Sequence, residues 1–154
     1  SQVSVSVEVI KKLRAATGLG VHDIKKALEE ASGDEARALE LLKKRGLETV
    51  AKKSGRETLA GLIEGYVHAG RIGALVEVGC ETDFVARNDE FKYLVKELAI
   101  QIASMNPQTV EELLTQEYFR DQSQTVGDLL NQMIAKLGEK LEVVRFQRLA
   151  LDND

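Results

Sequence analysis

The sequence predicts an α+β protein in which a three-helix module precedes a three-stranded antiparallel sheet packed with helices. Three observations predict this architecture. Apolar residues recur every three or four positions at first, switch to strict alternation near residue 58, and return to helical spacing near residue 91. We therefore expect two domains: residues 1–56 form the helical module with its linker, and residues 57–154 form the α+β core.

The first two predicted helices end at Gly18 and Gly33, because glycine readily takes the left-handed conformation that closes a helix. Asp34 can cap the third helix, which we expect to end at Gly46. The basic residues 51–56 then indicate a short helix end or a linker. The apolar positions at helical spacing are Val9, Ile10, Leu13, Val21, Ile24, Leu28, Ala31, Ala38, Leu41 and Leu42, of which we expect the last three to face inward.

The alternating segments, residues 58–68 and 72–80, flank the tripeptide Ala69-Gly70-Arg71, so they predict an antiparallel hairpin. Glycines within strands favour close packing of something against the sheet. Four occur here: Gly61, Gly65, Gly73 and Gly79.

Helical spacing over residues 91–102 predicts a long helix after the hairpin, and Thr109 can cap a short one. A regular apolar face over residues 126–137 predicts a further helix, which Gly138 ends. Residues 139–151 carry alternating apolar positions, and we expect them to form the third strand.

The composition limits the possible functions. The chain has 154 residues, of which 44% are hydrophobic and 30% charged, so it can bury a core without disulfides. Cys80 is the only cysteine, which excludes an internal disulfide framework and a cysteine-rich zinc site. No apolar run approaches the roughly 18 residues of a membrane span, and the first residues do not resemble a signal peptide. We therefore expect a cytosolic protein that does not contact membranes.

Little in the sequence indicates a metal, a cofactor or direct nucleic-acid binding. The histidines, His22 and His68, are isolated from other ligands, and the glycines around Leu19 lack the remaining residues of a phosphate-binding loop. Residues 1–56 carry a charge of +4 and residues 57–154 carry −8. The basic positions within residues 43–56 are more typical of a solvated helical face than of a nucleic-acid surface. We expect no metal, no cofactor and no enzymatic chemistry.

The unusual segment is residues 80–88, between a predicted strand and a predicted helix. Phe84 and Val85 lie next to Asp83 where polar residues should dominate. Two interpretations fit this pattern. One of the apolar side chains can pack against the following helix as a staple, or the aromatic ring can be presented to a partner's pocket.

Three stretches resemble the translation elongation factor Ts family in the family's order. Residues 82–88 are similar to its signature, and residues 13–28 to its N-terminal, ubiquitin-associated-like helical module. Residues 134–139 with 143–146 are similar to its C-terminal helix and strand. The resemblance covers nearly the whole chain.

The resemblance implies a guanine-nucleotide exchange factor for elongation factor Tu, which would bind both its GDP-bound and its nucleotide-free forms. Asp83 and Phe84, flanked by Thr82 and Val85, would enter the GTPase domain near its magnesium and nucleotide, displace Mg²⁺ and promote GDP release. Other implied partner contacts are Leu13, Val21, His22, Leu137, Gly138 and Glu139.

Some of these positions have alternative interpretations. His22 stands where the family more often has an apolar residue, and it can also be a solvent-exposed histidine in the first turn of its helix. Leu137 can be a core residue and Gly138 a helix stop.

This chain resembles a short form of the family with a single core, and short members can dimerise. We expect a homodimer that acts in the bacterial cytoplasm or, with a transit peptide removed, in an organelle. Two other functions remain open. Residues 7–46 alone fit a ubiquitin-associated-type module with an unrelated partner, and Cys80 could serve a small thiol enzyme.

Overall fold

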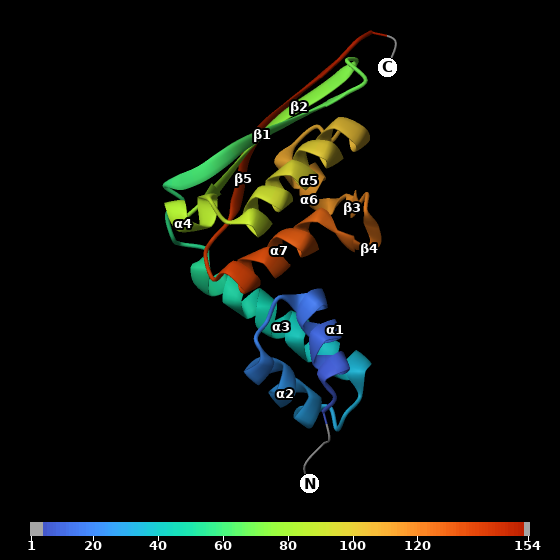
Figure 1. Ribbon diagram of the computed structural model, residues 1–154, viewed down its shortest axis with the longest axis vertical. Helices are drawn as coiled ribbons and strands as arrows, with labels where there is room; N and C mark the ends of the chain where they lie inside the picture. Colours follow the sequence, from blue (N-terminus) through green and yellow to red (C-terminus); the bar gives the residue numbers. More distant parts are fainter. Residues whose placement is uncertain (1–4, 153–154) are drawn as a thin grey trace. The chain divides into compact units, whose positions relative to one another are not determined.

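The computed structural model describes residues 5–152, which divide into two compact units (Figure 1). The first unit contains the described residues up to Gly55 together with Asn131–Gly138. The second contains Arg56–Leu130 and the described residues from Glu139 onwards. The chain therefore contributes to the first unit twice.

The first unit contains the helices α1 (Val7–Thr17), α2 (Val21–Glu30) and α3 (Glu35–Lys53). The Asp34 carboxylate accepts a hydrogen bond from the Arg37 N–H, so it caps α3 as the sequence predicts. Gly18 ends α1 in the left-handed conformation with a φ of 72°. The predicted apolar positions line the core with the exception of Val21, which is 38% exposed. The buried members of this core are Leu13, Leu19, Ile24, Ala27, Leu28, Ala31, Ala38 and Leu42.

The predicted end of the third helix at Gly46 is wrong, because α3 continues to Lys53. A glycine within a helix costs only about 1 kcal/mol relative to alanine, and good helix formers follow this one. A stop also requires the left-handed conformation, which Gly138 adopts after its helix with a φ of 74°, whereas Gly46 stays helical. Glycine type alone therefore does not mark a helix end.

The second unit contains the predicted three-stranded antiparallel sheet, formed by β1 (Ala60–His68), β2 (Ile72–Cys80) and β5 (Glu142–Ala150) in the order β1-β2-β5. Ala69 and Gly70 both have positive φ, which gives the tight turn of the β1–β2 hairpin. The short helix α4 (Asp83–Ala86), α5 (Asp89–Met105) and α6 (Val110–Thr115) follow, and Figure 1 shows α5 and α6 along one side of the sheet. The predicted α+β fold is confirmed.

The two faces of the sheet differ in burial. The face towards α5 is buried, with Val76 and Val78 on β2 and Phe91 and Leu98 on α5 among its fully covered side chains. The opposite face has apolar side chains that are more than half exposed in the single chain. The register places them on adjacent strands: Ile63 and Val67 on β1, Leu75 on β2, and Leu149 on β5.

A small hairpin that the sequence analysis did not predict, β3 (Glu117–Tyr118) and β4 (Asp121–Thr125), precedes α7 (Val126–Leu137). β3 has only two residues and the five residues of β4 are all polar, so neither strand shows alternation of apolar and polar residues. Buried polar side chains of α5 hold it in place. The Glu97 carboxylate accepts hydrogen bonds from the Tyr118 hydroxyl at 2.7 Å and from Arg120. The side-chain amide of Gln101 donates a hydrogen bond to the Glu117 carbonyl at 3.0 Å.

Candidate functional site

Residues 80–88, which carry the unusual apolar pair, contain α4, a one-turn helix between β2 and α5. The Thr82 hydroxyl accepts a hydrogen bond from the Val85 N–H at 3.4 Å and caps this turn. Asn88 caps the next helix, because its side-chain oxygen accepts from the N–H groups of Glu90 and Phe91 at 2.8 and 3.1 Å. Both ends of the segment are therefore fixed by local hydrogen bonds.

The structure assigns different positions to the two adjacent apolar side chains of this segment. Val85 is 9% exposed, so it anchors the turn in the second unit. Phe84 is 84% exposed, and the Arg87 guanidinium lies 6.0 Å from the centre of its ring. Asp83 is exposed beside it. The burial of Val85 fits the staple interpretation, and the exposure of Phe84 leaves its ring accessible to a partner.

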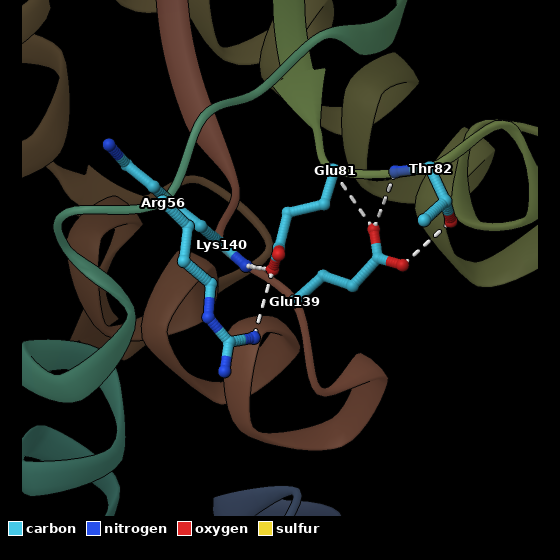
Figure 2. Close-up of polar contacts among 5 residues, drawn as sticks. All are labelled: Arg56, Glu81, Thr82, Glu139 and Lys140. Carbon is cyan, nitrogen blue, oxygen red and sulfur yellow. Dashed lines mark hydrogen bonds and ion pairs between the residues drawn. The ribbon is translucent and has the colours of Figure 1, made fainter.

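Two glutamates join this segment to the loop before β5 (Figure 2). One carboxylate oxygen of Glu139 accepts from the N–H groups of Glu81 and Thr82 at 3.0 and 3.1 Å, and the other accepts from the Thr82 hydroxyl at 2.7 Å. In return, the Glu81 carboxylate accepts from the Lys140 N–H at 2.6 Å and pairs with Arg56 at 3.4 Å. The role of Glu81 was missed in the sequence, because no local pattern links it to residue 140.

The other predicted contact residues lie in the first unit. Val21 and His22 are exposed in the first turn of α2, whereas Leu13 is 3% exposed and packs in the core. Leu137 is half-buried, and Gly138 is exposed with its N–H donating to the Ile134 carbonyl at the end of α7. Leu13 therefore acts as a core residue of the first unit and is not accessible to a partner. Among the three predicted contact residues of α1 and α2, the accessible ones are Val21 and His22.

Cys80 has the environment of a core residue. Its side chain is fully buried, and its Sγ–H donates to the Thr82 carbonyl at 3.3 Å. Burial, followed by the negative charge of Glu139, raises the pKa of the thiol to about 11, so little thiolate exists at neutral pH. This environment argues against a nucleophilic role for Cys80.

We expect iodoacetamide to alkylate Cys80 in the folded protein at least about tenfold more slowly than in the urea-unfolded chain at the same pH. Burial and the raised pKa both lower the concentration of accessible thiolate. Mass spectrometry over time would measure both rates. Equal rates would contradict the burial of Cys80, and only a rate faster than that of the unfolded chain would favour the thiol enzyme.

Two features are absent from residues 5–152. No cluster of three or more histidine, cysteine, aspartate or glutamate side chains in this part of the chain has an arrangement that could hold a metal ion. Nor is any helix there both long enough and apolar enough to cross a membrane.

A family profile and individual relatives both match this chain, the profile over its second half and the relatives over nearly all of it. The family profile described as Elongation factor TS matches residues 81–154. Elongation factor Ts of Thermoanaerobacter sp. (strain X514) is 41% identical over 190 aligned positions, which cover 94% of this chain and 93% of that protein. Elongation factor Ts of Thermotoga neapolitana is 43% identical, with 95% and 96% covered.

The alignments also show that this chain is short. With Thermoanaerobacter, 94% of the 154 residues is about 145, so about 45 of the 190 aligned positions have no counterpart here. With Elongation factor Ts of Clostridium kluyveri, 46% of 148 positions are identical, and the match covers 96% of this chain but 48% of that protein.

Proposed function

The chain belongs to the elongation factor Ts family, and from this premise we propose that it is a guanine-nucleotide exchange factor for elongation factor Tu. It would bind the GDP-bound Tu factor, promote GDP release, and leave the nucleotide-free form to reload with GTP. The setting would be the bacterial cytosol during protein synthesis. Exchange of this kind breaks and forms no covalent bond, so it requires neither a nucleophile nor a cofactor.

The observation that supports this proposal most directly is the exposed ring of Phe84 on a turn that is otherwise anchored. A phenylalanine ring that is exposed to water contributes no free energy of burial, so this position of Phe84 does not stabilise the isolated chain. Filling an apolar cleft of a partner would contribute about 1.5–3 kcal/mol from burial of such a ring. Because α4 is already ordered, little of that energy is offset by ordering the turn.

The 82–85 turn would act as a wedge in the GTPase domain. Phe84 would displace elements that hold Mg²⁺ and the nucleotide phosphates, and the exposed Asp83 would add a negative charge next to them. Loss of the metal weakens nucleotide binding, because Mg²⁺ is held jointly by the protein and the phosphates. Val21 and His22 would form a second contact from the first unit.

The test is stopped-flow release of a fluorescent GDP analogue from the Tu factor. Mixing with excess unlabelled GDP alone gives the intrinsic release rate. We expect the intact chain to increase that rate with a saturable dependence on its concentration. An unchanged rate at tens of micromolar chain would contradict the proposed function.

We also propose that the chain is a homodimer in which two copies pair through the exposed apolar face of the sheet. Ile63, Val67, Leu75 and Leu149 are the apolar side chains of that face, and all are more than half exposed in the single chain. The register also places the ion pair of Glu77 with Arg145 there, at the edge next to Ile63. Large contiguous apolar patches on soluble proteins commonly mark interfaces. A two-fold axis brings the same patch of each copy together, so one apolar face suffices for both.

Replacing Leu75 by lysine should dissociate this dimer, because two cations would be buried at the interface. The matched control is Leu47→Lys, since Leu47 on α3 is 59% exposed and Leu75 57% exposed. Analytical ultracentrifugation at micromolar concentration should give a dimer for the intact chain and for the control, and a monomer for Leu75→Lys. A 17.0 kDa species for the intact chain would refute the dimer.

A further inference from the structure

We propose that Glu139 is a positioning residue for the 82–85 turn, acting through Thr82, and that it does not itself contact the Tu factor. This inference rests on the proposed function, which makes the 82–85 turn the part of the chain that enters the GTPase domain. The resemblance alone implied a direct partner contact at Glu139, but the geometry of its carboxylate points to an intramolecular role.

Both carboxylate oxygens of Glu139 are already engaged within the second unit. One accepts the N–H groups of Glu81 and Thr82, and the other accepts the Thr82 hydroxyl at 2.7 Å (Figure 2). Hydrogen bonds to a charged group are the stronger kind, and three of the roughly four acceptor positions of this carboxylate are occupied, so little acceptor capacity is left for a partner. The side chain is consequently better suited to holding the turn than to binding another protein.

The Thr82 hydroxyl transmits this restraint to α4. An ionised carboxylate can only accept, so the hydroxyl proton must point towards Glu139. That orientation leaves the lone pairs of the hydroxyl oxygen free, and one of them accepts the Val85 N–H at 3.4 Å. A chain of hydrogen bonds thus runs from Glu139 through Thr82 to the backbone next to Phe84.

Strand pairing explains why two segments so distant in sequence meet here. The register pairs Gly79 of β2 with Glu142 of β5, so the residues after β2 and those before β5 emerge at the same end of the sheet. Glu81, which follows β2, makes the reciprocal contact to the segment before β5, since its carboxylate accepts a hydrogen bond from the Lys140 N–H at 2.6 Å. Each segment therefore binds the backbone of the other, and the two glutamates together form a reciprocal clamp.

The experiment compares Glu139→Ala, Glu139→Gln and a matched control, Glu142→Ala. Glu142 lies three residues further along and also accepts from a threonine hydroxyl, that of Thr58 at 3.1 Å, but it does not contact the turn through any hydrogen bond that the structure gives. Glutamine at position 139 can keep the carbonyl oxygen that accepts the two backbone N–H groups, so it should restore most of the restraint. Thermal unfolding establishes that every variant is folded.

The first readout is amide hydrogen exchange in the free protein, which does not depend on any partner. For Glu139→Ala we expect exchange at Thr82 and Val85 to be about tenfold faster, with Glu139→Gln and the control close to the intact chain. Unchanged exchange at both amides in Glu139→Ala would overturn the clamp, whatever the function of the protein.

The second readout is GDP release from the Tu factor at saturating chain, measured as a double-mutant cycle with Phe84→Ala. We expect Glu139→Ala to reduce the accelerated rate about tenfold in the intact background and to change it less than twofold in the Phe84→Ala background. Additive losses would mean that Glu139 makes a separate partner contact, and would overturn the positioning role. If the intact chain accelerates nothing, the proposed function fails, and hydrogen exchange alone decides the clamp.

Discussion

Replacing Phe84 by alanine should reduce the accelerated GDP-release rate about 10- to 100-fold, the effect of losing about 1.5–3 kcal/mol of ring burial. The folded protein itself should hardly change. Phe84 is 84% exposed, and substitutions at such positions usually alter the free energy of unfolding by less than about 0.5 kcal/mol. A large kinetic loss without a loss of stability is therefore expected at this residue.

Two further variants make the Phe84 prediction specific. Phe84→Leu keeps an apolar side chain and should retain more activity than Phe84→Ala. Tyr93→Ala removes another exposed aromatic ring, from α5 and outside the turn, and should leave the rate within about twofold. Stopped-flow kinetics at saturating chain would measure all of them. Full activity of Phe84→Ala would contradict the role of this ring and mean that other contacts with the Tu factor accelerate GDP release.

Replacing Phe91 by alanine should have the opposite profile. Phe91 lies in the first turn of α5 and is fully buried, so its loss should lower the free energy of unfolding of the second unit by about 3–5 kcal/mol. This is a large share of the roughly 5–15 kcal/mol by which domains are stable. We thus expect Phe84→Ala to lower the GDP-release rate without a loss of stability, and Phe91→Ala to lower the stability of the second unit.

Urea denaturation followed by tyrosine fluorescence would test the Phe91 prediction. The chain has no tryptophan, and its three tyrosines, Tyr66, Tyr93 and Tyr118, all lie in the second unit. The signal therefore reports on that unit and not on the helical module. Leu47→Ala in the first unit is the control and should leave this transition unchanged. An unfolding midpoint for Phe91→Ala equal to that of the intact chain would contradict the assignment of Phe91 to the core.

The hairpin and the helical faces could be predicted because their signals are local. Residues 60–80 carry a period-two pattern around a glycine turn, and the glycine after α7 ends it as expected. The end of α3 could not be predicted in the same way. Whether Gly46 stops a helix depends on its backbone conformation, and neighbouring helix formers decided that here.

The site was predictable only in part. The position of Phe84 and Val85 between a predicted strand and a predicted helix placed both in a turn. Two adjacent apolar residues in one turn have no periodicity, so the sequence could not predict which of them is buried and which is exposed. The contact of Glu139 with Thr82 spans 57 positions. It follows from the pairing of β2 with β5, and no motif in either segment encodes that pairing.

A chain that promotes GDP release must bind the nucleotide-free Tu factor more tightly than the GDP-bound form. Linkage makes this directly measurable, because the factor by which the chain weakens GDP binding must equal the factor by which GDP weakens the chain. Isothermal titration of both forms of the Tu factor would give the two affinities. We predict a preference of at least about fivefold for the nucleotide-free form. Equal affinities would contradict the account, since a ligand that binds both states equally shifts neither.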